Sequence, residues 1–143
     1  MINWTEEYST GFGSIDEQHK DLFRHINELE KIVQEPDKLH PSQIMATLVF
    51  LESYCESHFQ YEEKCMHKFS CSSAGANLEA HAKFLELLTR FQKDFKDHQN
   101  DKNSLIALSK ELYELTSDWI RSHICKIDVK LRDVKLGLGE RHL

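Results

Sequence analysis

The chain has 143 residues, of which 40% are hydrophobic and 29% charged, enough for one domain with a real core. Five glycines and two prolines leave few of the turns that an all-β fold needs. A net charge of −6 without a basic cluster argues against a nucleic-acid partner. The sequence shows neither a run of about 18 apolar residues nor an amino-terminal secretion signal, so we expect a cytoplasmic protein with no membrane partner.

Cysteine and histidine usage set the next expectations. The four cysteines contain no CxxC pair and fit neither a structural zinc site nor a disulfide framework, so we expect reduced thiols. Nine histidines are more than a chain of 143 residues ordinarily carries. The question is therefore whether those histidines point into the core.

Residues 1–15 have no helical period and predict an extended arm. Asp16 is a suitable N-cap for the first helix, which we expect to end before Pro36. His19 lies three residues before Leu22 and therefore on the core side of that helix. The apolar stripe of this helix repeats at spacings of three and four residues: Leu22, Ile26, Leu29 and Val33.

The second helix is predicted from about Ser42 to Phe69. His58 and Glu62 stand four residues apart, about 40° around a helix axis, so both side chains lie on one face. Both occupy positions where the stripe calls for apolar residues. Burying an unpaired carboxylate is costly, and metal ligation would explain this glutamate.

The third helix is predicted over Asn77–His98, with Leu78 as the first residue of its stripe, and the fourth from about Ser104. His81 and His123 continue the apolar stripes of these two helices. Asp128 is harder to place, because five residues of ideal helix turn it about 140° away from His123. The two side chains can reach one site only if the helix ends or distorts between them.

Four long helices with short connections predict an all-α fold, an antiparallel up-down-up-down four-helix bundle with an N-terminal extended arm. We expect the bundle to span residues 1–135, with 136–143 as a tail or the start of a linker. Imidazole and carboxylate groups without a thiolate set suit iron, manganese or zinc. The sequence therefore predicts a metal site in the bundle core, with two metals.

Together these residues resemble the hemerythrin family of non-heme diiron oxygen-binding proteins, and its bacterial members in particular. The resemblance covers Trp4 to about Leu131 in ordered pieces: Trp4, Ile-Asp-Glu-Gln-His at 15–19, His58-Phe59 with Glu62-Glu63, His81 with Phe84, and His123-Ile124 with Asp128. It implies two iron ions, bridged by carboxylates and by an oxo or hydroxo group.

The resemblance also implies a role for each residue. His19 and His58 would bind one iron, His81 and His123 would bind the other, and Glu62 with Asp128 would bridge them. An apolar pocket for dioxygen or a small anion would be lined by Leu22, Phe59, Trp119, Ile120 and Ile124. Ordinary core packing is the alternative role for each of these five residues.

Asn77 departs from the family pattern, because it stands where a third histidine on the second iron is usual, four residues before His81. Its amide is a weaker, harder donor than imidazole. It could ligate poorly, hold a water, or leave a position for an exogenous anion. Each of these roles alters the redox behaviour of the metals.

We therefore expect an oxygen or redox sensor that dioxygen oxidises easily, coupled to an output domain or protein through the C-terminus. The alternatives are a reversible oxygen carrier or store, and a peroxide-reactive diiron enzyme. An enzyme is the less favoured class, because no general acid or base stands out. A ferritin-like oxidase is disfavoured because the chain has no Glu-x-x-His motif.

Overall fold

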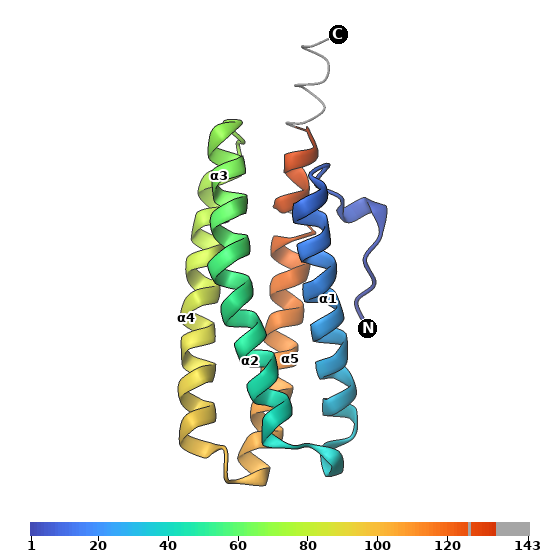
Figure 1. The fold of residues 1–143 in the computed structure, drawn as a ribbon, viewed down its shortest axis with the longest axis vertical. Coiled ribbons are helices and arrows are strands. Elements are labelled where there is room, and N and C mark those ends of the chain that lie inside the picture. Colours follow the sequence, from blue (N-terminus) through green and yellow to red (C-terminus); the bar gives the residue numbers. More distant parts are fainter. Residues whose placement is uncertain (126, 134–143) are drawn as a thin grey trace.

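The computed structural model describes residues 1–125 and 127–133, and within these ranges it contains helices and no strand. The helices form four antiparallel rods: α1 (Gly13–Gln34), α2 (Pro41–Tyr54) continued by α3 (Gln60–Lys68), α4 (Ala74–His98) and α5 (Lys102–His123). Their directions alternate along the chain (Figure 1). The predicted all-α, up-down-up-down four-helix bundle is confirmed.

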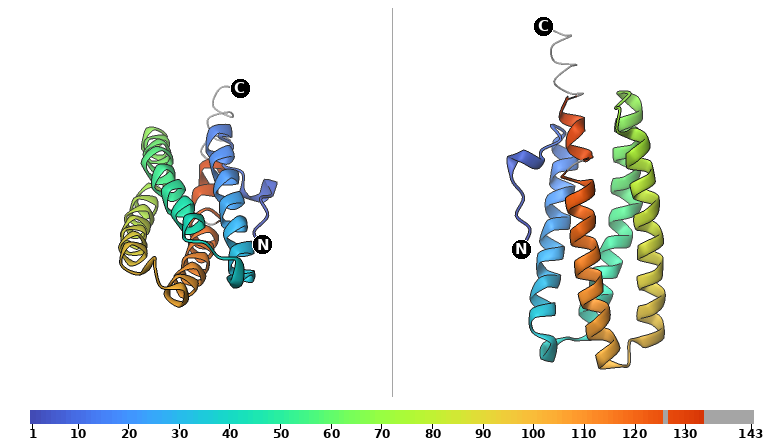
Figure 2. Two further views of the ribbon diagram at one scale, coloured as in Figure 1. Left: turned by 60° about the horizontal axis from the view of Figure 1, so that its bottom comes forward. Right: turned by 180° about the vertical axis from the view of Figure 1, so that it is seen from behind.

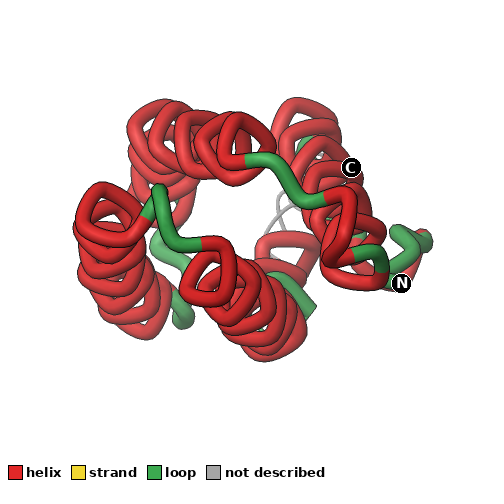
Figure 3. Tube along the Cα trace, turned by 90° about the horizontal axis from the view of Figure 1, so that it is seen from below, coloured by secondary structure: helices red, strands yellow, loops and turns green. Residues whose placement is uncertain are grey.

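Each rod packs against two neighbours. α1 lies beside α2 and α5, and α4 lies beside α2 and α5, so the helices form a closed ring around one axis. Figure 3 shows this ring from below, and Figure 2 shows α5 beside α1 from behind. Every rod can therefore direct one face toward the same central axis.

The N-terminal arm is shorter than predicted, because α1 begins at Gly13 and the arm contains a 3-10 turn, η1 (Glu6–Tyr8). The prediction that Asp16 caps the helix is wrong. Its carboxylate instead accepts hydrogen bonds of 2.8 Å from both the amide and the hydroxyl of Thr10, and one of 2.7 Å from Ser9. Asp16 thus ties the arm to the first turn of α1.

Three other helix boundaries also differ from the prediction. α4 begins at Ala74 rather than Asn77, because two alanines with high helix propensity extend it backwards. Leu78 is 52% exposed and does not belong to the core stripe. α5 begins at Lys102. The second rod is not one α-helix, because a π-helical segment, η3 (Cys55–Phe59), separates α2 from α3.

The connection between α3 and α4 is a tight turn at Ser70, whose φ of 53° lies in the left-handed region. The Cys71 amide donates to the Met66 carbonyl at 2.9 Å, and the Ser70 amide donates to the His67 carbonyl at 3.1 Å. This bond pattern is a Schellman cap, in which glycine is the usual residue. Ser70 therefore carries a backbone cost that glycine would not.

The core consists of two apolar clusters. The larger fills the bundle from the level of Leu22 to the connection η2 (Pro36–Lys38). The smaller closes the opposite end with Ile15, Met66, Cys71 and Leu131. Between them lie the buried polar side chains that the sequence singled out. The predicted tail, 136–143, lies outside the described residues.

Candidate metal centre

The second rod supplies His58 and Glu62, which are 1% and 0% exposed. His58 lies in the π-helical segment, and Phe59 next to it is also buried at 3%. A π turn rotates each residue by somewhat less than the 100° or so of an α-helix, which shifts the residues that follow it around the rod. Such π segments often occur at functional sites. The spacing of four residues predicted the pair, but nothing in it predicted the π turn.

The last rod resolves the difficulty of Asp128. α5 ends at His123, and Asp128 begins a separate 3-10 turn, η4 (Asp128–Lys130). The helix therefore ends between the two residues, as their spacing required. Both side chains are buried, at 1% and 0% exposure, and His123 Nε2 lies 3.0 Å from Asp128 Oδ1.

One group of ligand-type atoms gathers around His19. Its Nε2 lies 3.1 Å from His58 Nε2, 3.3 Å from Glu62 Oε2 and 3.2 Å from Asp128 Oδ2. His58 Nε2 is 3.3 Å from the same Glu62 oxygen. Four buried donors from three segments of chain thus converge on one point.

A second group gathers around His81 and uses the other oxygens of the same carboxylates. His81 Nε2 lies 3.1 Å from both Glu62 Oε1 and His123 Nε2. His123 Nε2 in turn contacts Asp128 Oδ1 rather than Oδ2. Each carboxylate therefore presents one oxygen to each group, which is the arrangement of a bridge between two metals.

The spacing of these atoms fits octahedral metal coordination. Bonds of about 2.1 Å at right angles place adjacent donor atoms about 3.0 Å apart. The contacts between neighbouring nitrogen and oxygen donors in the two groups run from 3.0 to 3.3 Å, and one longer contact, from His123 Nε2 to Glu62 Oε1, is 3.6 Å. Neutral imidazoles and carboxylates are ligands that iron, manganese and zinc accept. The six predicted ligands are all buried and brought together.

Asn77 is the seventh buried polar residue of this layer, at 0% exposure on the first turn of α4. One terminal atom of its amide lies inside the second group. That atom is 2.9 Å from Glu62 Oε1, 3.0 Å from His123 Nε2, 3.1 Å from His81 Nε2 and 3.2 Å from Asp128 Oδ1. The amide is thus in position to contact anything that the second group binds.

Two outer residues orient the imidazoles. His81 Nδ1 lies 3.0 Å from Glu63 Oε1, and His58 Nδ1 is hydrogen-bonded to Gln18 Oε1. An acceptor at Nδ1 fixes the proton there and leaves Nε2 free to bind a metal. Both partners lie beside ligands in the sequence, at 18 and 63, yet spacing alone did not show which ring each would contact.

Aromatic rings cover three of the four histidines. Tyr54 stacks on His58 at 4.6 Å, Phe59 stacks on His81 at 3.7 Å, and Trp119 stacks on His123 at 4.3 Å between centroids. Tyr54, which is 6% exposed, was not among the predicted site residues. These contacts hold the imidazoles in place and exclude water from the layer.

The predicted apolar lining is buried around the same layer. Leu22, Ile120 and Ile124 are each 0% exposed, and Trp119 is half-buried with its Nε1 3.4 Å from the Ala80 carbonyl. A hollow of about 330 Å³ between α4 and α5 reaches Trp119 and His123 from outside. A dioxygen pocket formed by these residues stays a prediction.

The charge distribution couples the two groups. Burial lowers the pKa of His19, but its contacts with Asp128 and Glu62 outweigh burial and raise that pKa to about 9. The same balance raises the pKa of His123 to about 9. Burial prevails at His58, whose pKa is lowered. Burial would raise the pKa of Glu62, but contacts with the four imidazoles hold it well below its usual range. Metal binding must therefore displace protons.

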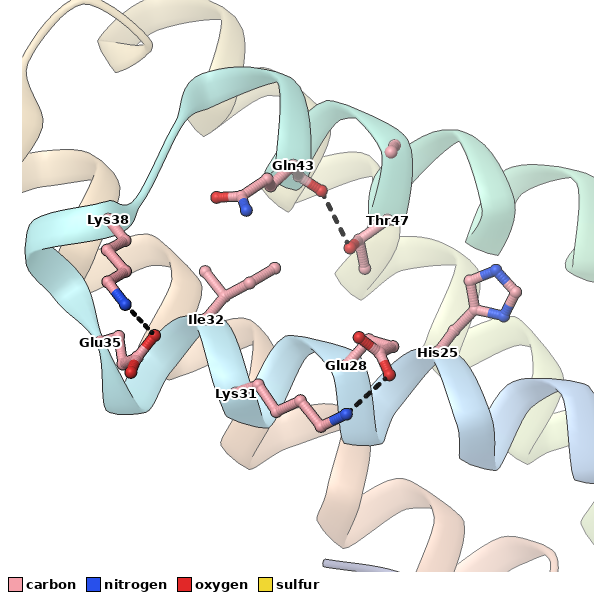
Figure 4. A pocket seen from close by; sticks show the side chains of 9 residues that line it. His25, Glu28, Lys31, Ile32, Glu35, Lys38, Gln43 and Thr47 are labelled. Carbon is pink, nitrogen blue, oxygen red and sulfur yellow. Dashed lines mark hydrogen bonds and ion pairs between the residues drawn. The ribbon is translucent and has the colours of Figure 1, made fainter.

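A larger hollow, of about 460 Å³, lies far from this layer between the end of α1 and the start of α2 (Figure 4). Its two lysines are paired within the helix turns, Lys31 with Glu28 at 3.1 Å and Lys38 with Glu35 at 3.4 Å. His25 at its edge stacks on Phe50 at 3.5 Å between centroids. The described residues that line it form no cluster of metal-ligand type.

Fold and site together define a four-helix bundle with a buried histidine–carboxylate centre. The family model described as the hemerythrin HHE cation binding domain matches residues 10–132, so the chain belongs to the hemerythrin family. It is 28% identical over 129 residues to a bacteriohemerythrin of Methylococcus capsulatus, covering 90% of this chain and 92% of that protein.

Two further relatives agree with this assignment. A bacteriohemerythrin of Clostridium acetobutylicum is 26% identical over 131 residues, 90% of this chain and 96% of that protein. A myohemerythrin of Theromyzon tessulatum is 26% identical over 129 residues, 90% of this chain and 89% of that protein. None of the helices in the described ranges is both long and apolar enough to cross a membrane.

Proposed function

We propose that the chain binds two non-heme iron ions and responds to dioxygen as an oxygen or redox sensor. His19 and His58 hold one ion, His81 and His123 hold the other, and Glu62 and Asp128 bridge them. The observation that supports this proposal is the division of the carboxylate oxygens: Glu62 Oε2 and Asp128 Oδ2 face His19, while Oε1 and Oδ1 face the second group.

The surrounding residues supply the rest of the proposed chemistry. Iron held by these residues would supply the electrons that reduce dioxygen. Gln18 and Glu63 keep Nε2 of their imidazoles available. Leu22, Ile120 and Ile124 exclude water from the layer, so that dioxygen, an apolar molecule, is favoured there over ions.

The position of Asp128 supports a sensing role. It stands on the short turn that follows α5, and Leu131, three residues further, is fully buried in the small end cluster. A change in the charge or ligands of the centre acts directly on this segment, which leads toward the C-terminus. A signal requires that such a change favour one of two packing arrangements. The C-terminus is therefore the proposed connection to an output domain or protein.

Anaerobic reduction followed by exposure to air tests this function, with visible absorption and metal content measured together. Two irons per chain and prompt conversion to a diferric spectrum support the sensor. Hydrogen exchange at residues 124–133 should then differ between the reduced and oxidised forms. Chains that bind no iron would exclude the diiron centre.

A long-lived oxygenated spectrum would instead support the alternative of a reversible oxygen carrier or store. Asn77 supports the sensor, because its amide replaces an imidazole with a harder, weaker donor. Rapid, repeated consumption of hydrogen peroxide would support the third candidate, a peroxide-reactive enzyme. A cytoplasmic location is also part of the proposal, and the reduced thiols of Cys55, Cys65 and Cys71 agree with it.

A further inference from the structure

The amide of Asn77 has the surroundings of a metal ligand. A donor atom at one vertex of an octahedron has four adjacent donors, each about 3.0 Å away when the bonds are about 2.1 Å long. The inner amide atom has four such neighbours at 2.9 to 3.2 Å. It therefore occupies a fifth coordination position of the group formed around His81 and His123.

The remaining position of this group follows from the other contacts. Around the amide, His81 adjoins Glu62 at 3.1 Å and His123 at 3.1 Å, and His123 adjoins Asp128 at 3.0 Å. The contact from His123 to Glu62 Oε1 is the longest of the group, at 3.6 Å, so these two atoms are the pair assigned to opposite vertices, which bonds of about 2.1 Å would place about 4.2 Å apart. Among the described residues, the vertex without a protein donor is the one opposite Asn77.

The two orientations of this amide suit two different states. With the oxygen inward, it faces the carboxylate oxygens of Glu62 and Asp128 at 2.9 and 3.2 Å, and the nitrogen on the far side faces only donors. With the nitrogen inward, the NH2 group donates to Glu62 at 2.9 Å and to Asp128 at 3.2 Å. Buried polar groups that lack partners are costly, so the metal-free protein favours nitrogen inward. A cation reverses that preference, because it needs lone pairs.

We propose that Asn77 is a two-state ligand, which binds the second metal through Oδ1 and turns its NH2 group inward when that metal is absent. The inference rests on the proposed diiron function. Rotation of about 180° around the Cβ–Cγ bond exchanges the states, and the backbone of α4 need not move. Binding of the second metal then breaks the hydrogen bonds from the amide to Glu62 and Asp128, and this loss reduces the net affinity for that metal. Because an amide oxygen is a hard donor, it favours Fe³⁺ over Fe²⁺ at this position.

Anaerobic Fe²⁺ titration against a competing chelator tests this role, using the wild type, Asn77→Leu and Asn77→Asp. Leucine has the same branched shape and number of heavy atoms but no donor atom, so the second iron should bind at least about tenfold more weakly. Aspartate supplies a charged oxygen and cannot donate, so the second iron should bind at least about tenfold more tightly. Thr116→Val is the control, because Thr116 is equally buried and its hydroxyl has no hydrogen-bond partner in the described part.

If the NH2 group instead stays inward when iron is bound, Asn77 is not a ligand and Asn77→Leu should not weaken binding of the second iron. Removing its hydrogen bonds would free the lone pairs of Glu62 and Asp128, so Asn77→Leu would bind the second iron as tightly as the wild type or more so. That result would overturn the inference alone. Wild-type protein without iron would overturn both the inference and the proposed function.

A crystal structure of the iron-loaded wild type gives an independent measurement. We expect the inner atom of the Asn77 amide about 2.1 to 2.3 Å from the second iron. A separation beyond about 3 Å would contradict ligation, whatever the affinities show. If Asn77→Leu fails to fold, the Asn77→Asp titration and this distance still decide the question.

Discussion

The two halves of the bundle use the same four rods in opposite ways. The half that contains the hollow of Figure 4 is filled with side chains such as Leu29, Ile44 and Phe91, each at most 1% exposed. The other half contains a layer of buried imidazoles and carboxylates, closed by the small apolar cluster around Met66 and Leu131. The apolar half gains free energy from burial, whereas the polar layer costs free energy unless its groups are paired or bind a metal.

This difference separates stability from function along one helix. On α1, Leu29 and His19 are both 0% exposed and ten residues apart. Truncating the leucine should cost folding free energy and leave metal binding intact. Altering the metal layer should remove the metals and leave the apolar half folded.

Glu62→Gln should have the largest effect, because Glu62 contacts all four histidines and lies in both groups. An amide carries no negative charge to offset two cations, so affinity for both irons should fall at least about 100-fold. Metal content after anaerobic loading measures this. Helix content by circular dichroism should stay near that of the wild type.

Glu52→Gln is the matched control on the same rod, because Glu52 is exposed and its recorded side-chain partner is Gln92, at 3.2 Å. This variant should load two irons. Two irons in Glu62→Gln as well would contradict the bridging role.

Leu29→Ala tests the apolar half. Deleting a fully buried leucine side chain removes apolar contacts and leaves a cavity, so the free energy of unfolding should fall by about 2 to 5 kcal/mol. Urea unfolding of the metal-free protein measures this. Iron stoichiometry should remain that of the wild type, and a loss of iron would show that the two halves are coupled more strongly than their separation suggests.

The pH dependence of the metal-free protein should arise in the polar layer. The pKa of His19 and of His123 is raised to about 9 in the folded chain, above the value of about 6.5 for an unfolded imidazole. The stabilisation is therefore complete below about pH 6.5 and is lost as the pH rises through about 9. The Tm of the metal-free protein should fall between pH 7 and pH 10.

Iron-loaded protein provides the comparison for this pH series. Bound metal holds the imidazoles neutral, so its Tm should change less over the same range. Equal slopes for the two forms would contradict the assignment of the pH dependence to these histidines.

Side-chain periodicity accounts for what the sequence revealed. Helical spacing located the four rods, and His58, Glu62, His81 and His123 were recognised because each interrupts an apolar stripe. The family resemblance supplied the pairing of these residues into two groups. The structure brings the six side chains together in two groups that share Glu62, and their binding of metal stays a prediction.

Contacts between distant segments account for what the sequence did not reveal. Aspartate is a residue type that is common at N-caps, but the oxygens of Asp16 accept hydrogen bonds from Ser9 and Thr10 because the arm folds back onto α1. The π turn at Cys55–Phe59 has no signature in residue spacing. Local propensity is overridden in such places by tertiary packing. The stacking of Tyr54 on His58 follows a spacing of four residues, which places both rings on one helix face, so this contact could have been predicted.

The smallest expected effect lies at Ser70, near the metal layer but outside it. Its φ of 53° costs a serine free energy that glycine avoids, so Ser70→Gly should raise the free energy of unfolding by up to about 1 kcal/mol. Ser72→Gly is the control, because Ser72 does not share the positive φ and glycine there only adds freedom to the unfolded chain. Urea unfolding of both variants, with iron affinity measured beside it, gives the test. A gain at position 70 without a change in iron affinity would show that the polar end of the bundle can be stabilised independently of its metals. A gain accompanied by weaker iron binding would mean that the strained turn helps to position Asn77, seven residues further along the chain.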